Sequence, residues 1–448
     1  MKKKIVLLSI FLLTISTLLI VKSKNVIAYT GADKLKNYQQ VDTEFRGVWV
    51  ATVYNLDMKK QKGTNAEAIN EWKNRYLTIL DTAKANNLNA IIFQIRPCND
   101  AFYPSEYNPW SEYLCGYGVN PGWDPLEWMI EVTHEYGLEY HAWLNPYRAT
   151  VSSNVSIIEK SGTIRNVVDY DDQKLQADKK SVFGSLKNRA GKTPSGSDYQ
   201  NPVFSEGKQL EHNVVLGAED KYVLNPAASE TIEHLENTIE EIITNYNIDG
   251  IHFDDYFYPD TDKSIDNAEY QKYLKKGSKS SLSDWRRENV SNMIKSVYSA
   301  VKSVNKKVKF GISPASNIDN DYSSLYADVE KWSQDSGYID YICPQIYFGF
   351  KNVKQPFMQT TKKWTNTAKC DLYIGLPLYK CSKPDEYAAK NDESIINEFK
   401  NNNDIIARQI RYIKNFDEIG GFYLFSYSCL FDENCKNEVE NLLKEMRE

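Results

Sequence analysis

Several residue patterns that mark common enzyme classes are missing from this chain of 448 residues. No Cys-x-x-Cys pair occurs, and the 5 histidines are scattered without the spacing of a metal site. The chain also lacks a glycine-rich phosphate loop and a Gly-x-Ser-x-Gly nucleophile motif. These absences argue against structural zinc, nucleotide chemistry and a serine nucleophile, so we expect no metal and no cofactor.

An excess of positive charge is missing as well. The formal net charge is −6, so nothing in the composition suggests nucleic acid as a partner. Aromatic side chains are abundant instead, with 31 Tyr and 9 Trp. Flat rings stack on the apolar faces of sugars, so the composition is consistent with a carbohydrate ligand. A large aromatic core is the alternative explanation.

The 7 cysteines are an odd number, so they cannot all pair within the chain. In an oxidising compartment the candidate disulfides are Cys98 with Cys115 and Cys370 with Cys381. Isolated buried thiols are the alternative.

The N-terminus has the pattern of a secretory signal. Three lysines precede an uncharged apolar stretch over 5–21, and "VIA" at Val26–Ala28 is a cleavage motif. We therefore expect a signal peptide over 1–28 and a mature protein that is secreted or held in the cell envelope, outside the cytoplasmic membrane. Because the apolar run is nearly long enough to span a bilayer, the alternative is an uncleaved anchor that associates with the membrane.

Short β-rich runs alternate with helical segments through the rest of the chain. The eight runs begin at Glu44, Asn89, Glu139, Ile248, Val308, Tyr338, Asp371 and Gly420. The clearest helical segments are 70–86, 125–137, 229–246 and 283–304. This alternation predicts an α/β fold, a (β/α)8 TIM-type barrel, in one catalytic domain over 40–448. A doubly wound open sheet is the alternative, and it is disfavoured because no glycine-rich dinucleotide loop follows the first strand.

Two connections after strands are long, and in a barrel both lie at the catalytic end. The loop over 101–123, after strand two, is rich in aromatic residues and includes Trp110; the loop over 150–221, after strand three, is polar. Such loops typically form substrate walls.

Polar residues collect near the carboxyl ends of four predicted strands. Because residues two apart on a strand share a face, the expected sets are Gln94 with Arg96, then His141, Trp143 and Asn145, then His252 with Asp254, and Gln345 with Tyr347. In a barrel these ends converge, so the sets predict a polar active site.

The adjacent Asp254 and Asp255 must point in different directions. We place Asp254 inward with His252, and Asp255 toward a neighbouring strand, where Arg96 or Arg148 is the expected partner. Helix capping or loop solvation is the alternative role of the pair. Glycoside cleavage normally needs two carboxyl groups. No Glu stands at the carboxyl end of a predicted strand, and the acidic candidates are Asp57, Asp100, Asp254, Asp255 and Asp260.

The longer motifs resemble the glycosyl-hydrolase-like family 10. They are "FRGVWVATVYNLD" from Phe45, "QIRPCNDAFYPSEYNPWSEYL" from Gln94, "HAWLNPYR" from His141, "YVLNPA" from Tyr222, "DGIHFDDYFYP" from Asp249 and "CPQIYF" from Cys343. The resemblance runs in order from about Glu44 to Tyr427. It implies an exported (β/α)8 barrel that cleaves glycans, and at least one member of the family acts on peptidoglycan strands stripped of their stem peptides.

The fourth of the eight predicted strands also resembles the Asp-Gly-x-Asp-x-Asp-x-Glu signature of chitinase-type family 18 enzymes. Asp249, Gly250 and Asp254 match that signature. His252 replaces its middle Asp, and Tyr256 stands where the catalytic Glu is expected, so the chitinase mechanism does not transfer directly. Substrate assistance by an N-acetyl group stays open if Asp254 orients the acetamide.

The sequence thus predicts a glycosidase acting on an N-acetylated envelope glycan, with a polysaccharide as its partner. Asp254 is the leading catalytic carboxylate, as nucleophile, base or acetamide orienter, and Asp255 and Asp100 compete as proton donor. The expected substrate-binding residues are Arg96, Asn145, His252, Tyr256, Gln345, Tyr347 and Trp110. An exopolysaccharide hydrolase and a glycan-binding barrel without catalysis are the alternatives.

Overall fold

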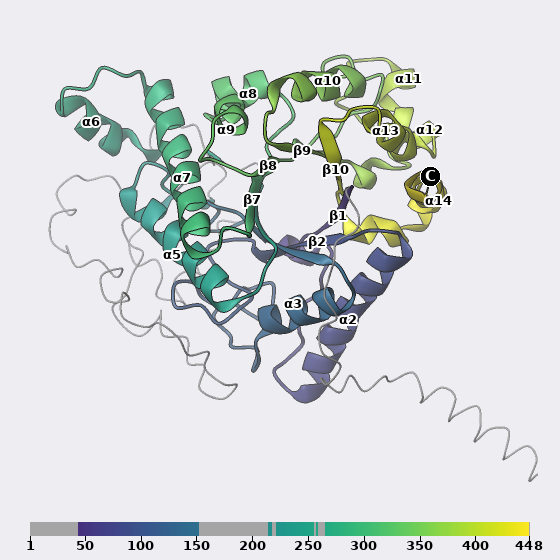
Figure 1. Ribbon diagram of the computed structural model, residues 1–448, viewed down its shortest axis with the longest axis horizontal. Coiled ribbons are helices and arrows are strands. Elements are labelled where there is room, and N and C mark those ends of the chain that lie inside the picture. The colour runs from purple at the N-terminus through teal and green to yellow at the C-terminus, as the bar shows by residue number, and fades with distance from the viewer. Residues whose placement is uncertain (1–43, 152–213, 217–220, 255–256, 259–264, 448) are drawn as a thin grey trace, which may run out of the picture. The chain divides into compact units, whose positions relative to one another are not determined.

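Eight parallel strands close into a barrel in the computed structural model (Figure 1). The structure describes residues 44–151, 214–216, 221–254, 257–258 and 265–447. The barrel strands are β1 (Phe45–Val50), β2 (Ala90–Arg96), β3 (Glu139–Leu144), β6 (Gly250–Phe253), β7 (Lys309–Ile312), β8 (Tyr341–Ile342), β9 (Asp371–Leu376) and β10 (Ile419–Leu424). Their order around the barrel is β1-β10-β9-β8-β7-β6-β3-β2.

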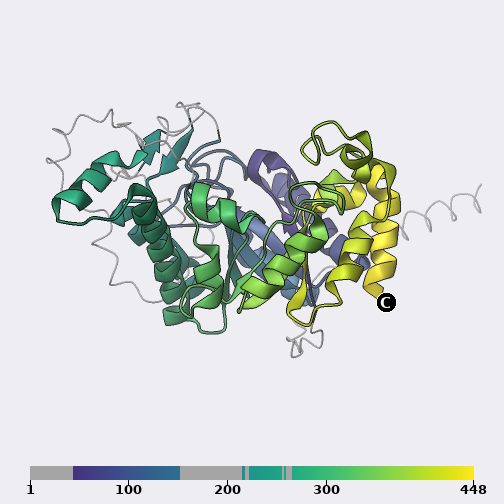
Figure 2. The ribbon, with the colours of Figure 1, turned by 90° about the horizontal axis from the view of Figure 1, so that it is seen from above.

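Helices lie outside the strands and connect them (Figures 1 and 2). They are α2 (Ala66–Ala85), α3 (Pro125–Glu135), α5 (Ser229–Asn245), α6 (Asn267–Lys275), α7 (Leu282–Val304), α8 (Ile318–Ser324), α9 (Val329–Gln334), α10 (Phe357–Thr367), α11 (Glu393–Ile396), α12 (Glu398–Asn401), α13 (Ile405–Ile413) and α14 (Lys436–Arg447). The α14 helix follows the last strand and packs against α13.

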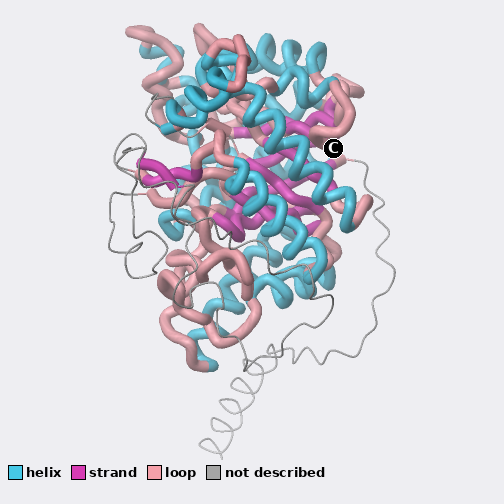
Figure 3. The backbone as a smooth tube through the Cα atoms, turned by 90° about the vertical axis from the view of Figure 1, so that its left-hand side faces the viewer, coloured by secondary structure: helices cyan, strands magenta, loops and turns pink. Residues whose placement is uncertain are grey.

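The predicted barrel is confirmed, and the open-sheet alternative is wrong because β1 pairs with β2 on one side and with β10 on the other. The predicted strand from Tyr338 is reduced to the two residues of β8. Pro344 has no N–H to continue the ladder, and beyond it only isolated bridges at Gln345 remain. The sequence did not predict the antiparallel hairpin of β4 (Val214–Leu216) and β5 (Tyr222–Leu224), which is separate from the barrel (Figure 3).

Side-chain caps explain where the main helices begin. Asp124 accepts hydrogen bonds from the backbone N–H groups of Leu126 and Glu127 at 3.0 and 3.2 Å, and Pro125 occupies the first turn of α3. Ser281 caps α7 in the same way, by accepting from the N–H of Asp284 at 3.1 Å. Such caps satisfy backbone donors that the first helical turn leaves unpaired.

The barrel interior is filled by aromatic rings that need glycine beside them. Tyr341 on β8 is fully buried, and its ring crosses in front of Gly311 on β7. A Cβ added to Gly311 would lie 2.1 Å from that ring, and a Cβ on Gly250 would lie 2.4 Å from the imidazole of His141. These two positions therefore accept no side chain while the rings keep their places.

The carboxylate of Asp57 links β1 and β10, the two strands whose pairing closes the barrel. One oxygen of Asp57 accepts from the N–H of Ala51, just after β1, at 2.8 Å. Its other oxygen accepts from the hydroxyl of Ser426 at 3.0 Å and the N–H of Ser428 at 2.9 Å, both after β10. Asp57 thus joins the two strands that complete the barrel.

The structure contains neither of the two candidate disulfides. All seven cysteines are free thiols, and Cys381 hydrogen-bonds Cys435 rather than Cys370. In the part of the chain that the structure describes, no helix is both long and apolar enough to cross a membrane. The expected leader at 1–28 lies outside the described residues.

We predict that Gly311→Ala lowers the free energy of unfolding by about 3 kcal/mol, because the new methyl group forces the Tyr341 ring out of place. Gly420→Ala is the matched control, since the nearest atom to its Cβ, in the Tyr373 ring, would lie at 3.0 Å rather than 2.1 Å. Urea unfolding of both variants measures the difference. Equal losses in the two variants would contradict the packing argument.

Candidate active site

The centre of the candidate site is a pair of side chains at the ends of neighbouring strands. Asn145 follows β3 and Asp254 follows β6, and these strands are paired in the barrel. Asn145 Nδ2 donates to Asp254 Oδ1 at 2.8 Å. Asn145 and Asp254 expose only 0% and 5% of their surfaces, so this contact is made largely out of water.

The orientation of the Asn145 amide is fixed by the backbone. Its Oδ1 accepts from the N–H of Arg148 at 2.7 Å and of Tyr147 at 3.3 Å. With the oxygen occupied, the NH2 group faces Asp254, and the chain reversal after β3 holds it there. The predicted inward placement of Asn145 and Asp254 is thereby confirmed, and their contact adds what strand periodicity alone did not indicate.

The predicted shared face of Gln94 and Arg96 is wrong. The pairing of β2 with β3 shifts register between these two residues, so Gln94 lies opposite Trp143 whereas Arg96 lies opposite Leu144. Arg96 then contacts His234 on α5, and its guanidinium is fully buried. A β-bulge of this kind redirects a side chain without any change in sequence periodicity.

Arg96 binds protein groups with its guanidinium. NH1 donates to the carbonyl of Asn145 at 2.5 Å, NH2 to Asn99 Oδ1 at 2.5 Å, and Nε to Asn108 Oδ1 at 3.3 Å. Burial lowers the pKa of Arg96 to about 10, which leaves it charged at neutral pH. The structure therefore gives Arg96 a supporting role beneath Asn145 in place of the predicted contact with substrate.

His252 points inward as predicted, and both of its ring nitrogens contact protein groups. The indole N–H of Trp49 donates to His252 Nε2 at 3.1 Å, and His252 Nδ1 lies 2.9 Å from the Tyr341 hydroxyl. The residue is fully buried, and burial lowers the pKa of His252 well below its usual range. An indole can only donate, so the neutral imidazole carries its proton on Nδ1.

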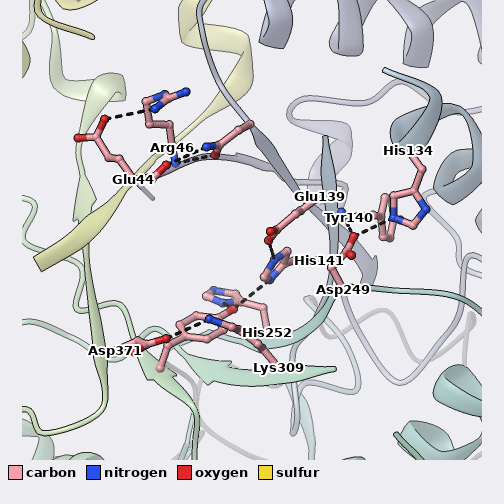
Figure 4. A network of polar contacts seen from close by, with 12 residues as sticks. Glu44, Arg46, His134, Glu139, Tyr140, His141, Asp249, His252, Lys309 and Asp371 are labelled. Carbon is pink, nitrogen blue, oxygen red and sulfur yellow. Dashed lines mark hydrogen bonds and ion pairs between the residues drawn. The ribbon is translucent and has the colours of Figure 1, made fainter. Parts of the chain in front are cut away.

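The hydrogen bonds of His252 continue down the barrel (Figure 4). The Tyr341 hydroxyl also lies 3.4 Å from His141 Nδ1, and His141 Nε2 lies 3.0 Å from a carboxylate oxygen of Glu139 at the start of β3. This chain of polar contacts occupies the barrel interior below the candidate site. These contacts give His252 a structural role, and its predicted contact with substrate stays a prediction.

Asp100 is a buried carboxyl in the loop after β2. Its exposed fraction is 1%, one oxygen accepts from the N–H of Cys98 at 3.0 Å, and Ser111 also hydrogen-bonds it. Burial raises the pKa of Asp100 from 3.8 to about 6, despite these donors. A raised pKa suits a proton donor near neutral pH.

The remaining predicted residues divide into three groups. Gln345 and Tyr347 are partly buried after β8; Gln345 Nε2 donates to the carbonyl of Ser313 at 3.1 Å, and the Tyr347 ring stacks on Phe425 with centroids 5.9 Å apart. The Trp110 indole is packed in the core with 2% of its surface exposed, so it presents no face to a sugar. Asp255, Tyr256 and Asp260 lie outside the described residues.

Among the described residues, no group of three or more His, Cys, Asp or Glu side chains has the arrangement of a metal site. The described strand ends carry a carboxylate, Asp254, and the amides of Asn145 and Gln345.

A parallel (β/α)8 barrel with a carboxylate at its carboxyl-terminal end has the architecture of barrel glycosidases. The sequence profile of the family described as "Glycosyl hydrolase-like 10" matches residues 44–180 and 196–393. The chain belongs to this family, and the resemblance seen in its motifs is confirmed.

Two similar proteins carry the same general description. Glycosyl hydrolase YngK of Bacillus subtilis (strain 168) is 36% identical over 378 residues, which cover 78% of this chain. The match spans 65% of YngK, slightly less than two thirds of its length. Glycosyl hydrolase DigH of Escherichia coli (strain K12) is 32% identical over 370 residues, covering 77% of this chain and 76% of DigH.

Among solved structures, α-L-fucosidase isoenzyme 2 from Paenibacillus thiaminolyticus is similar in fold. Its TM-score is 0.50 at 11% sequence identity, over 90% of this chain and 49% of that chain. At this identity the likeness supports the barrel fold and says nothing about the substrate.

The raised pKa of Asp100 predicts a pH-dependent effect of Asp100→Asn on stability. The folded carboxyl binds its proton more tightly than the unfolded one, so its contribution to stability is present below pH 4 and is lost as the pH rises through about 6. Relative to wild type, Asp100→Asn should therefore gain on the order of 2 kcal/mol between pH 4 and pH 7.5. Urea unfolding at the two pH values measures this gain, and a difference that does not change with pH would refute it.

Proposed function

We propose that this protein is an exported glycoside hydrolase that cleaves an N-acetylated cell-envelope glycan, with peptidoglycan glycan strands as the substrate. The observation that carries the proposal is the buried contact between Asn145 and Asp254 at the carboxyl ends of β3 and β6. It stands on the family membership and on the barrel fold.

Asp254 acts on the sugar in this proposal. Asn145 donates to one of its oxygens, and a carboxylate can accept several hydrogen bonds at once. Hydrogen bonding of this kind favours the ionised form of a carboxyl group, which is the form that a nucleophile, a base or an acetamide orienter requires. Asp254 supplies one of the two carboxyl groups of a glycosidase.

The second carboxyl group is the proton donor. Asp100 has the raised pKa that this role needs, but it is buried beneath its loop. Asp255 is the rival donor, because it is the neighbour of Asp254 in the chain. Asp57 is less suited, because its two oxygens are held by groups after β1 and β10.

The barrel's rigid strand ends favour catalysis over simple binding, because they fix Asp254 in a single orientation. The absence of a Glu after any described barrel strand leaves a glycan-binding barrel without catalysis as the second candidate. The two candidates differ in whether products form.

We predict that Asp254→Asn lowers turnover by about 10²–10⁴-fold while the fold is kept, because the variant retains an oxygen that accepts from Asn145 but cannot ionise. Asp371→Asn is the matched control, since Asp371 is an exposed residue at the opposite end of the barrel, where β9 begins. Mass spectrometry of products from peptide-free peptidoglycan strands measures turnover. If Asp254→Asn keeps more than about a tenth of it, the assignment of Asp254 is wrong.

The same assay compares substrates. Exopolysaccharide and chitin oligomers are incubated beside the peptidoglycan strands with the wild-type protein. Products from exopolysaccharide alone would replace the proposed substrate, and tight binding without products would support the non-catalytic candidate.

Export predicts that the native protein begins near Tyr29 and is found outside the cytoplasmic membrane. The reason is the basic and then apolar leader that ends at Val26–Ala28. N-terminal sequencing of protein from fractionated cells tests this expectation. A chain that begins at Met1 in the soluble cytoplasm would overturn it, and a chain that begins at Met1 in the membrane would indicate an uncleaved anchor.

A further inference from the structure

Three buried polar atoms on inward-facing side chains, toward the carboxyl ends of β2, β3 and β7, have no hydrogen-bond partner within the described residues. They are Gln94 Nε2, Trp143 Nε1 and Ser313 Oγ. The three side chains expose 0%, 5% and 0% of their surfaces. Because buried polar groups in proteins are nearly always paired, three such atoms near one carboxylate indicate a place for a polar ligand.

Strand register places the three side chains around Asp254. Trp143 on β3 lies opposite Gln94 on one side and opposite His252 on the other, and His252 is two residues before Asp254. Ser313 follows β7, and its N–H donates to the carbonyl of Phe253, the residue before Asp254, at 2.8 Å. Inward-facing positions of β2, β3 and β7 thus flank the carboxylate that follows β6.

The orientation of the Gln94 amide is fixed. Its Oε1 accepts from the backbone N–H groups of Thr52 at 3.1 Å and Val53 at 3.0 Å, just after β1. Since these donors occupy the oxygen, the unpaired group of Gln94 is its NH2, a pure donor. The indole N–H of Trp143 is a pure donor as well.

The site therefore presents two fixed donors, on Gln94 and Trp143, beside the carboxylate acceptor of Asp254, and the Ser313 hydroxyl can donate or accept. A sugar hydroxyl both donates and accepts, so it does not need this arrangement. A secondary amide matches this arrangement, because its carbonyl oxygen can only accept a hydrogen bond and its N–H can only donate one. Trp143 also belongs to an apolar cluster in the barrel interior with Trp49 and Cys343, which suits a methyl group.

We propose that Gln94 and Trp143 form, with Asp254, a subsite for the acetamido group of an N-acetylated sugar. The acetamido carbonyl accepts from Trp143 Nε1 and Gln94 Nε2, and the acetamido N–H donates to Asp254. This subsite rests on the proposed function, which it deepens by naming the chemical group that the protein selects. Sugars that carry a free amine or a hydroxyl at that position leave both donors unpaired.

Trp143→Phe tests the subsite by removing the N–H while keeping an aromatic ring. The substrates are peptide-free peptidoglycan strands and the same strands after chemical N-deacetylation. The expected result is a loss of about tenfold in kcat/KM on the acetylated strands, as for one hydrogen bond, and a small change on the deacetylated ones. The preference of wild type for acetylated strands thus shrinks in the variant.

Trp72→Phe is the matched control. Trp72 on α2 is also fully buried with an unpaired indole N–H, but it belongs to the cluster outside the barrel. The Trp72→Phe variant should keep the wild-type preference for acetylated over deacetylated strands. Gln94→Glu is the second variant, because it keeps the oxygen that binds Thr52 and Val53 and replaces only the donor. It should also reduce the preference.

A binding measurement tests the subsite without depending on turnover. N-acetylglucosamine and glucosamine are titrated against wild type, Trp143→Phe and Trp72→Phe, each first shown to be folded by circular dichroism. Selective weakening of N-acetylglucosamine binding by Trp143→Phe supports the subsite. An unchanged ratio of the two affinities, or equal weakening of both, overturns it. If wild type cleaves neither kind of strand, the proposed function fails while this arm still decides the subsite.

Discussion

Closure of the barrel is the constraint on which the rest of the structure depends. The first and last strands must pair, and Asp57 strengthens that seam by accepting hydrogen bonds from groups after β1 and after β10. Because all eight strands are parallel and closed, the residues that follow them meet at one end. The contact between Asn145 and Asp254, which are 109 positions apart in the chain, follows from that convergence.

The barrel interior then decides which inward residues remain for chemistry. Deep positions are filled by rings, and the imidazoles of His141 and His252 are hydrogen-bonded between Glu139, Tyr341 and Trp49. A buried charge there would be costly without a partner, and burial keeps His252 uncharged. The inward side chains toward the carboxyl ends of the strands, among them Gln94, Trp143, Asn145 and Asp254, form the layer that is left to meet a ligand.

Support for this layer comes from outside the barrel as well. Arg96, redirected by the register shift in β2, donates to the carbonyl of Asn145 and to the loop residues Asn99 and Asn108. The long loop after β2, which contains Asp100 and Trp110, is thereby fastened to the strand ends. The same loop that was expected to bind substrate through Trp110 instead buries that ring.

The sequence by itself determined the eight strands, the main helices and the inward placement of Asn145, His252 and Asp254, because period-two alternation and helical amphipathicity are local properties. Tertiary structure alone decided the bulge that redirects Arg96, the depth of His252 and the burial of Trp110. Depth along a barrel, and which donor each polar atom meets, depend on the relative register of strands far apart in the chain. No local pattern encodes that register, so the unpaired donors of Gln94 and Trp143 became visible only in the folded barrel.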